Sequence, residues 1–464
     1  MRLYDTATRG LVELPEPAER PIGMYFCGPT VYQRIHVGNA RPFVVSMWLR
    51  RWLRERGHDV TLVENITDIN DKIYAAAPGD SAKLAADAAR WYVEDTALLG
   101  LGRPDHEPLA TETIPEIVGL IEELIELDLA YEAAGDVYFR VNRFDDYGVL
   151  SGRLDEESVR NPSEEEEQSS LKENPRDFAL WKSHKEGEDT WWESPWGRGR
   201  PGWHIECSAM AEKHLGPAFE IHGGGVDLVF PHHENEIAQS RAAGLGFARY
   251  WVHHGLLNLG EAKMSKSIGN VIDIDAVVAQ GIRPVELRYY LAAPHYRSRI
   301  DYSEESLADA AAAYRRIEGF VRRAAERVGA GEPGDTLCAE FVEAMDDDLN
   351  TSRALAAVHD TVTGGNTALA EKNDTAAAGA LGSVRAMLGV LGLDPLDPRW
   401  TASAEPGLRR TVDGLVALAL EQREQARARK DWVAADAVRD QLRDAGVVVE
   451  DTPHGPRWTV DDGR

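Results

Sequence analysis

The chain has 464 residues, of which 43% are hydrophobic and 12 are Trp, so we expect a globular protein of two to four domains. No apolar run approaches the roughly 18 residues that a membrane span needs, and the first residues do not form a signal peptide. We therefore expect a cytoplasmic protein with no membrane partner. The three cysteines, Cys27, Cys207 and Cys338, are too few for a disulfide framework and fit a reducing compartment.

The net charge of −27 at pH 7 is the unusual feature of the composition. In dilute buffer such a surface repels itself and any polyanion. At molar salt the Debye length shortens to roughly 3 Å and the repulsion is screened. A halophilic source explains this charge most simply, and an ordinary acidic protein is the alternative. The acidity does not exclude a nucleic acid partner, but binding one requires local basic patches.

A strand, a helix and a second strand open the chain. Residues 22–27 read as a short buried strand. A helix with one apolar face follows from Ala40, and Gly57 suits its C-terminal end. Residues 58–64 form the next strand. This βαβ order predicts a parallel sheet that binds ligands at the carboxyl ends of its strands.

Two loops lie at that edge of the predicted sheet, residues 28–39 and 65–72. His36 to Asn39 open the helix, where free N–H groups and the helix dipole favour an anion. A single His in a loop is weak evidence by itself, because such a residue more often serves only the local structure.

Residues 112–200 read as an insertion into the sheet. A helix at 114–127 leads to a strand at 136–141 and then to an acidic loop with four consecutive glutamates, Glu164 to Glu167. These glutamates are typical of a solvated loop. Lys182 and the Trp residues that follow suit packing better than ligand binding.

The stretch from Gly202 to Gln239 carries candidate metal ligands. Cys207 lies on a helix, three glycines at 223–225 suggest a turn after a strand, and Pro231 suits the first position of another helix. On that helix His232 and Glu236 are four residues apart and share a face. A thiolate, an imidazole and a carboxylate favour zinc. The fourth ligand stays open at this point, and simple packing is the alternative.

A polar loop near residue 260 contains Lys263 and Lys266 in a chain that is poor in Lys, which favours phosphate contact over an incidental exposed loop. From Ser303 onwards, Ala-rich amphipathic runs predict a helical bundle with Cys338 in its core. A final helical pair and a hairpin with a turn at His454 follow. A basic cluster (Arg423, Arg427, Arg429 and Lys430) is the best candidate for a polyanion contact, and a salt-bridged helix face is the alternative.

Taken together, these motifs resemble the cysteinyl-tRNA synthetases, a family of class I aminoacyl-tRNA synthetases. The resemblance spans nearly the whole chain and includes CGPTVYQRIHVGNAR, PGWHIECS, HGGGVDLVFPHHENEIAQ, KMSKSIGN, MDDDLNTSRAL and the terminal EDTPHGPRW. Residues 36–39 are similar to the family's HIGH signature, and residues 263–267 match its KMSKS loop in full. One departure is Asn39, which stands where the signature has His, and we expect it to retain phosphate binding with altered pH sensitivity.

The resemblance implies an α/β fold. A Rossmann-like parallel-sheet catalytic domain with an insertion precedes an α-helical bundle and a small C-terminal anticodon-binding domain. The segments are the first catalytic half, the insertion, the second catalytic half with the metal site, the KMSKS and stem-contact region, the bundle and the anticodon-binding domain. Their expected bounds are 1–111, 112–200, 201–260, 261–302, 303–400 and 401–464.

The resemblance also assigns site residues. Cys27 becomes the fourth ligand of one Zn2+ per subunit, with Cys207, His232 and Glu236. ATP, with Mg2+, binds at His36, Gly38, Asn39, Asp227, Lys263 and Lys266, and of these His36, Asn39 and Lys266 are catalytic. Thr30, Trp203 and His222 shape the cysteine pocket.

The implied activity is that of a cysteine–tRNA ligase, with L-cysteine, ATP and tRNA(Cys) as substrates, and a monomer is expected. A zinc ion prefers a thiolate to a hydroxyl, so the metal selects the substrate thiol and no editing domain is needed. Two rivals remain: a ligase that joins cysteine to a glucosamine-inositol acceptor, which lacks the anticodon-binding end, and a catalytically silent RNA- or zinc-binding relative, which predicts a broken KMSKS loop.

Overall fold

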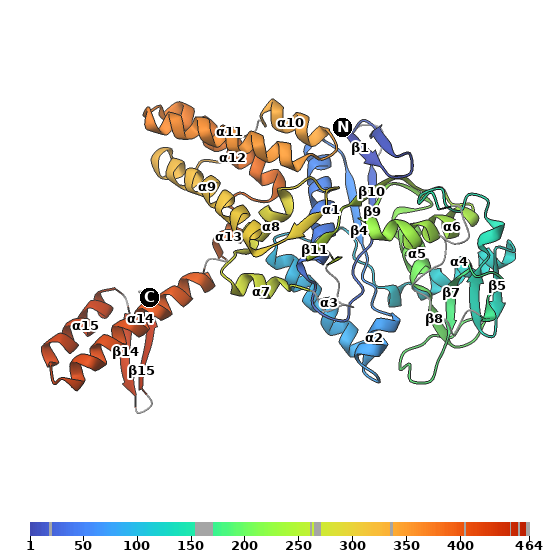
Figure 1. Cartoon of the computed structure of the whole chain (residues 1–464), viewed down its shortest axis with the longest axis horizontal. Helices are drawn as coiled ribbons and strands as arrows, with labels where there is room; N and C mark the ends of the chain where they lie inside the picture. Colours follow the sequence, from blue (N-terminus) through green and yellow to red (C-terminus); the bar gives the residue numbers. More distant parts are fainter. Residues whose placement is uncertain are drawn as a thin grey trace. The chain divides into compact units, whose positions relative to one another are not determined.

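The computed structural model divides into two compact units, Met1–Asp394 and Pro395–Arg464 (Figure 1). The structure describes residues 1–17, 21–153, 170–259, 262–263, 271–334, 337–402, 405–445, 447–452 and 455–460. No helix within these ranges is both long enough and apolar enough to cross a membrane.

A four-stranded parallel sheet forms the centre of the first unit, in the order β10-β9-β3-β4. The strands are β3 (Ile22–Phe26), β4 (Val60–Glu64), β9 (Ala218–Gly225) and β10 (Phe247–His254). Their residues are almost all buried, as expected when helices cover both faces of a parallel sheet. The predicted βαβ opening and parallel sheet are therefore confirmed, and Cys27 directly follows β3.

Helix α1 (Val37–Glu55) joins β3 to β4 and begins three residues before the predicted start at Ala40. The reason is a local cap, because the Nδ1 atom of His36 accepts a hydrogen bond from the backbone N–H of Asn39 at 3.2 Å. The predicted C-terminal end is confirmed, since Gly57 follows the helix with a φ of 87°.

The three glycines at 223–225 do not form the predicted turn but lie inside β9. A Cβ at Gly223 would overlap the Phe26 ring, and one at Gly224 would press on the His233 ring. These glycines therefore allow close packing between β9, β3 and the next segment. The chain turns only afterwards, in a 3₁₀ turn at Val226–Leu228.

Helices α1, α5 (Trp203–Leu215) and α6 (Glu234–Ala242) pack on the sheet, and α2 (Asp71–Ala76) and α3 (Ser81–Leu98) follow β4 along the chain. As predicted, Trp203 and Cys207 share a helix, α5. The prediction for Pro231 is wrong, because it follows a cis peptide bond inside a π-helical turn, Val229–His233, and α6 begins only at Glu234. That turn brings His232 and Glu236 to the same side of the chain all the same, with 3.1 Å between Nε2 and Oε1.

The insertion contains α4 (Ile114–Glu126), as predicted, and a four-stranded antiparallel sheet of which the sequence indicated only one strand. The strands are β5 (Ala130–Ala133), β6 (Asp136–Phe139), β7 (Phe178–Ser183) and β8 (Gly199–Pro201), and short 3₁₀ turns lie at Ala110–Glu112 and Val141–Arg143. Its core joins α4 and the sheet to α5 through residues such as Ile121, Phe178 and Ile205. The four consecutive glutamates, Glu164 to Glu167, lie outside the described residues.

The rest of the first unit is a small sheet and a helical bundle. A hairpin, β1 (Arg2–Asp5) and β2 (Gly10–Glu13), lies beside β10, and β11 (Leu257–Leu259) pairs with β12 (Ala262–Lys263) and β13 (Ile300–Tyr302). Helices α7 (Ile274–Ala279) and α8 (Pro284–Ala292) precede the bundle of α9 (Glu304–Val328), α10 (Ala339–Asp346), α11 (Thr351–Ala370) and α12 (Asp374–Leu391).

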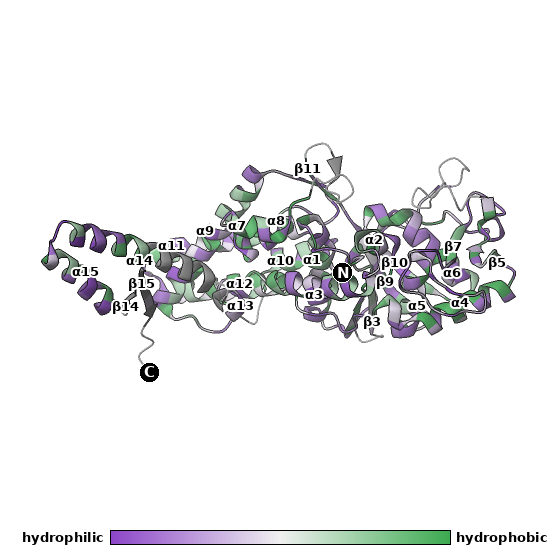
Figure 2. Ribbon diagram, turned by 90° about the horizontal axis from the view of Figure 1, so that it is seen from below, coloured by the Kyte–Doolittle hydropathy of each residue, from purple (hydrophilic) through white to green (hydrophobic). Residues whose placement is uncertain are grey.

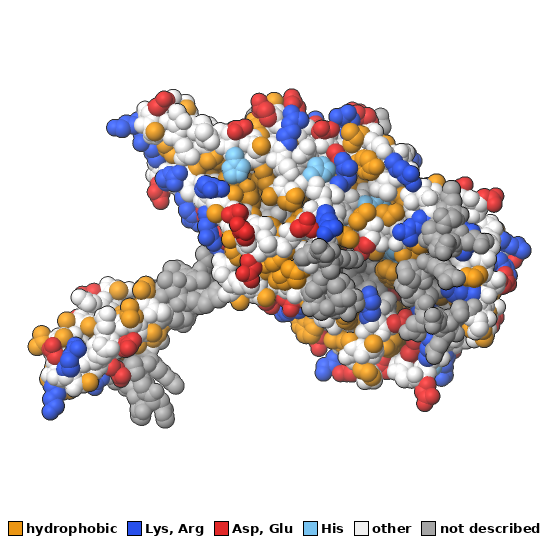
Figure 3. Space-filling view, in the orientation of Figure 1, with side chains coloured by type: hydrophobic (Ala, Val, Ile, Leu, Met, Phe, Trp, Pro, Cys, Tyr) orange, Lys and Arg blue, Asp and Glu red, His pale blue; other side chains and the backbone are white. Residues whose placement is uncertain are grey.

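The bundle confirms the predicted amphipathic helices, each of which carries hydrophilic and hydrophobic residues along its ribbon (Figure 2). Cys338 is not in its core but is half-buried at the start of α10, with its sulfur 3.5 Å from that of Met387. Acidic and basic side chains are interspersed on the face in Figure 3.

The second unit contains α13 (Pro398–Ala402), α14 (Glu405–Ala428), α15 (Trp432–Asp444) and the predicted hairpin, β14 (Val447–Thr452) with β15 (Gly455–Val460). Val416, Leu420 and Val447 form its core, and His454, in the predicted turn, lies outside the described residues. In the basic cluster Arg427, Arg429 and Lys430 are exposed, whereas Arg423 is only 7% exposed. Arg423 therefore belongs to the packed side of α14, which corrects its assignment to the contact surface.

Candidate metal centre and active site

Four donor atoms from separate elements lie close together next to the end of β3. Cys27 follows β3, Cys207 lies on α5, His232 is in the π-helical turn, and Glu236 lies on α6. One atom from each of these side chains lies within 4.8 Å of those from the other three, and all four residues are buried. Cys27 and Glu236 also form a second such group with His222 and His233.

Distances within the groups distinguish them. In a tetrahedral zinc site, bond lengths near 2.0–2.3 Å place the ligand atoms ~3.3–3.8 Å apart. The two sulfurs are 3.9 Å apart, the Cys27 sulfur is 3.5 Å from Glu236, and His232 is 3.1 Å from Glu236, so the first and last distances lie only slightly outside that range. His222 lies only 2.7 Å from Glu236, which is a hydrogen-bond distance. The donor set of Cys27, Cys207, His232 and Glu236 therefore fits zinc, with His222 as the partner of a ligand.

Further histidines orient these ligands from behind. His222 Nε2 contacts Glu236 Oε2, and the Nδ1 atoms of His204 and His232 are 2.9 Å apart. The His233 ring joins His253 through nitrogens 2.8 Å apart. Such outer contacts fix the rotamer and the tautomer of ligating side chains.

Burial and mutual contacts set the protonation of this cluster. The hydrogen bond from the Cys27 thiol lowers the pKa of Cys207 to about 6, whereas burial raises the pKa of Cys27. Burial also lowers the pKa of His204 and of His233, so both rings are neutral at pH 7. His232, the histidine among the four donor residues, differs: although burial lowers its pKa, the contacts with Glu236 and Cys207 raise it above the ordinary value. Metal binding at this ring would therefore release a proton.

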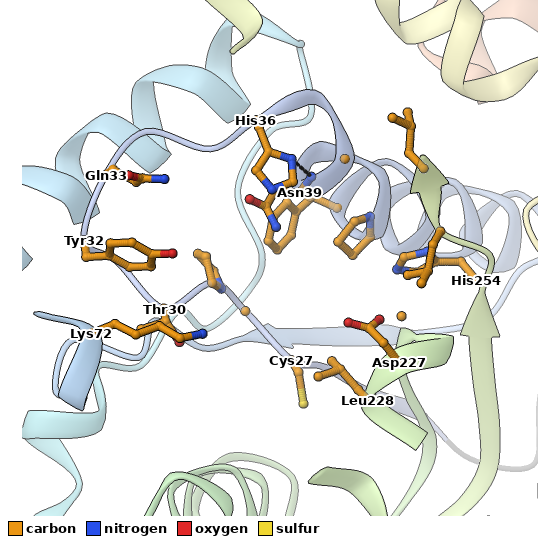
Figure 4. Close-up of a pocket in the computed structure, with 18 of the residues that line it drawn as sticks. Cys27, Thr30, Tyr32, Gln33, His36, Asn39, Lys72, Asp227, Leu228 and His254 are labelled. Carbon is orange, nitrogen blue, oxygen red and sulfur yellow. Dashed lines mark hydrogen bonds between the residues drawn. The ribbon is translucent and has the colours of Figure 1, made fainter. Parts of the chain in front are cut away.

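A cavity of about 670 Å³ lies beside this cluster of cysteine, histidine and glutamate side chains, with which it shares Cys27. His36 and Asn39 line it at the start of α1, and Asp227 and His254 line it on the opposite side (Figure 4). Cys27 belongs to both the cavity wall and the cluster, and its sulfur points away from His36. The cavity therefore connects a helix start suited to anions with the group of metal-ligating side chains.

The predicted site residues separate into three sets in the structure. Lining the cavity are Cys27, Thr30, His36, Gly38, Asn39 and Asp227. Trp203 and His222 do not line it but contact the cluster, Trp203 by stacking on His232 with ring centres 4.3 Å apart. Lys266 and the side chain of Lys263 lie outside the described residues.

Sequence reasoning missed three residues near the site. His233 follows His232 and contacts the Cys27 sulfur at 3.3 Å. The buried Glu234 carboxylate accepts hydrogen bonds from the N–H groups of Gly148 and Ser151 at 2.9 and 2.7 Å. Lys72 lines the cavity from α2. Lys72 could have been found, because the segment after β4 was predicted to lie at this edge, but the partners of Glu234 are more than 80 positions away.

Comparisons with known proteins agree with this architecture. A family model described as "tRNA synthetases class I (C) catalytic domain" matches residues 14–312. A model described as "DALR domain" matches 340–395, and "Cysteinyl-tRNA ligase anticodon binding domain" matches 406–458. The matches follow the order of the predicted catalytic, bundle and C-terminal segments.

Curated relatives match over almost the full length. The chain is 50% identical over 466 residues to the cysteine–tRNA ligase of Streptomyces avermitilis, and 49% identical over 484 residues to that of Nocardioides sp., with 99% of each chain covered. The fold is similar to that of Mycobacterium tuberculosis methionyl-tRNA synthetase, solved with methionyl-adenylate, at a TM-score of 0.59 and 16% identity over 90% of this chain and 96% of that one. The chain therefore belongs to the cysteine–tRNA ligase family of class I tRNA synthetases.

Proposed function

We propose that this chain activates L-cysteine with ATP to cysteinyl-adenylate and transfers the cysteine to the 3′ end of tRNA(Cys). The observation that carries the proposal is the position of Cys27. This residue lines the cavity that contains His36 and Asn39, and its sulfur also lies among the donor atoms of Cys207, His232 and Glu236. One cavity thus combines a place for a thiol with a place for phosphates.

Cys27, Cys207, His232 and Glu236 would hold one Zn2+ per subunit. When bound, the zinc supplies a Lewis acid that prefers the thiolate of cysteine to the hydroxyl of serine. The protein's part is to hold the ligands in place, and the contact of His222 with Glu236 does so at 2.7 Å.

The cysteine pocket is proposed to lie between the cluster and the start of α1. Thr30 lines the cavity wall. Trp203 stacks on His232 and so limits the size of the side chain that reaches the cluster. His222 acts from behind, through Glu236. Size alone separates small amino acids by only ~10–200-fold, so these residues restrict the pocket while the thiol carries the selectivity.

ATP is proposed to lie across the start of α1. The absence of a Cβ at Gly38 lets the His36 ring approach the backbone, since a Cβ there would lie 3.0 Å from the ring. His36 and Asn39 then offer polar groups to the phosphates, and the Asp227 carboxylate on the opposite wall accepts hydrogen bonds from the ribose hydroxyls.

Lys263 and Lys266 complete the phosphate site in this proposal. Mg2+ accompanies ATP, and Lys266 stabilises the charge that develops on the departing pyrophosphate when the cysteine carboxylate attacks the α-phosphate. Both roles rest on the family's KMSKS pattern at residues 263–267.

The remaining assignments concern the tRNA contacts, the segment bounds, the oligomeric state and the cellular compartment. Residues 401–464 read the anticodon, and the exposed Arg427, Arg429 and Lys430 contact its phosphates. We keep the proposed division of the chain into segments that end at residues 111, 200, 260, 302 and 400. The enzyme works as a cytoplasmic monomer, and its acidic surface is adapted to high ionic strength.

Cysteine-dependent ATP–pyrophosphate exchange, followed by charging of tRNA(Cys), tests the function. We expect both activities, with no exchange on serine. Exchange without charging would instead indicate a ligase for a small amine acceptor, and a lack of exchange would indicate a silent relative. The C-terminal match at 406–458 disfavours the first of these rivals.

A further inference from the structure

A second cavity, of about 540 Å³, adjoins the first, and Asp227 and His254 line both. Three segments far apart in sequence build its remaining walls. Arg9 comes from the N-terminal hairpin, Arg153 from the end of the insertion and Arg297 from the loop before β13. None of these arginines has a role in the activity described above.

The walls are basic in a strongly acidic protein. Three arginines face one aspartate among the residues that line this cavity, although the chain carries a net charge of −27. Arg297 pairs with Asp348 at 2.7 Å and stacks over the Tyr4 ring at 4.3 Å. Arg153 stacks over the Phe230 ring at 4.6 Å. The cavity thus combines guanidinium groups with aromatic rings.

Arg9 has an unfavourable backbone conformation. Its φ of 56° is unusual for a residue with a side chain. Beside it, Gly152 has a φ of 70°, and a Cβ at that glycine would overlap the Arg9 guanidinium. Strained backbone kept at a cavity wall is typical of binding sites.

A buried carboxylate fixes the insertion side of the cavity. Glu234, on α6, accepts hydrogen bonds from the N–H groups of Gly148, Leu150 and Ser151 at 2.9, 3.5 and 2.7 Å. Leu150 and Ser151 themselves line the cavity. The same helix carries Glu236, so the loop before Arg153 is tied to the element that supplies a metal ligand.

We propose that this second cavity binds the single-stranded 3′ end of the tRNA, with Arg9 and Arg153 on its phosphates. The shared wall at Asp227 and His254 places such an end beside the adenylate, where the ribose hydroxyl must arrive. Exposed apolar surface at Val226, on the same wall, suits contact with a base. Basic and aromatic side chains together are typical of sites for single-stranded nucleic acid. This inference rests on the proposed function and locates its RNA substrate.

The test uses the full chain with Arg9→Gln and Arg153→Gln together, which remove charge but keep side-chain length. Two RNAs are compared, tRNA(Cys) and the same tRNA lacking its two 3′-terminal nucleotides. For the wild type we expect truncation to weaken binding about 10-fold. For the double variant we expect truncation to have no effect, because the contacts are already lost. The salt dependence of binding should also become less steep by about 1.4 units of log K per log salt, because two contacts to single-strand phosphates are lost at about 0.7 each.

Cysteine-dependent ATP–pyrophosphate exchange in the absence of tRNA distinguishes a failure of the RNA assignment from a failure of the proposed function. It also shows whether the variant is folded. The double variant should keep wild-type cysteine-dependent exchange and lose about 10-fold in single-turnover transfer at low tRNA. Arg249→Gln, on the exposed start of β10, is the matched control and should change neither. An equal effect of truncation in wild type and variant, or a loss of exchange through weaker ATP binding, would overturn the RNA assignment. A wild type without exchange would overturn the proposed function itself.

Discussion

The Arg41 guanidinium donates a hydrogen bond to the carbonyl oxygen of Gly255 at 2.5 Å, from the second turn of α1 to the segment that follows β10. It also donates to the carbonyls of Leu256 and His295, at 3.3 and 3.2 Å. Arg41 is buried, and burial lowers its pKa to about 10, so the side chain stays charged at pH 7. Since Leu256 lines the main cavity, this one side chain joins the proposed phosphate site to its opposite wall.

Replacing Arg41 should therefore damage both stability and ATP binding. Arg41→Met removes the hydrogen bonds of a buried charged donor, of the kind that contribute ~1.5–3 kcal/mol each. The loss is partly offset because each carbonyl keeps a second partner: the ring of His254 for Gly255, and the N–H groups of Ile300 and Ser298 for Leu256 and His295. We expect a loss of about 2–4 kcal/mol in the free energy of unfolding and a raised KM for ATP in exchange. Arg41→Lys should recover part of each. Arg249→Met is the control for loss of an exposed arginine, and equal behaviour of the two Met variants would contradict this role.

Loss of a proposed metal ligand should reduce amino acid selectivity more than it reduces phosphate chemistry. Cys207→Ala should lower zinc content, measured by elemental analysis, from one per subunit to a small fraction. We expect its preference for cysteine over serine in exchange to fall into the ~10–200-fold range that packing alone supplies.

Cys338→Ala is the matched control for this experiment. That cysteine lies beside Met387 in the bundle, away from the cluster, so the variant should keep both zinc and selectivity. An unchanged preference for cysteine in Cys207→Ala would remove the metal from the account of selectivity.

The sequence was informative where a local pattern determines the structure. The strand before Cys27, the helix that carries Cys207 and the amphipathic helices of the bundle all follow from hydrophobic periodicity and breaking residues. The start of α1 was predicted too late, because a side-chain cap by His36 decides it. Pro231 was misplaced because the chain forms a π-helical turn where the pattern indicates an ordinary helix start.

Contacts over long sequence separations were beyond such patterns. Cys27 and Cys207 are 180 positions apart, and only the family resemblance joined them. The glycines at 223–225 read as a turn, although the Phe26 and His233 rings are what require them. Arg9 and Arg153 line one cavity only because the N-terminal hairpin and the end of the insertion come together in the fold. Each of these features depends on tertiary packing that no local rule describes.

A buried carboxyl group should give the protein a distinctive pH dependence of stability. Burial raises the pKa of Glu64 from 4.5 to about 7, against the opposing hydrogen bond of Ser46. The folded state then binds the proton more tightly than the unfolded state. Folding is therefore favoured below pH 4.5 and loses that contribution as the pH rises to 7, by about 3 kcal/mol.

Glu64→Gln tests this assignment, because an amide needs no proton to remain neutral. In urea titrations the variant should be more stable than the wild type at pH 8, and the difference should shrink towards pH 5. Glu55→Gln, at an exposed position of α1, should show no such difference. A variant that is less stable than the wild type at pH 8 would mean that the Glu64 carboxylate is satisfied in its charged form.

Salt should stabilise this protein if its acidic surface is adapted to high ionic strength. With 78 acidic and 51 basic side chains, self-repulsion extends over ~10 Å at 0.1 M salt and over ~3 Å at 1 M. We expect Tm to rise and exchange to reach an optimum near molar KCl. Sucrose at equal osmolality separates screening from solute exclusion, because it leaves the charges unscreened. Charging alone also weakens through lost phosphate contacts, so exchange is the decisive measurement. Inactivation of exchange at molar KCl would exclude the halophilic interpretation and leave an ordinary acidic enzyme.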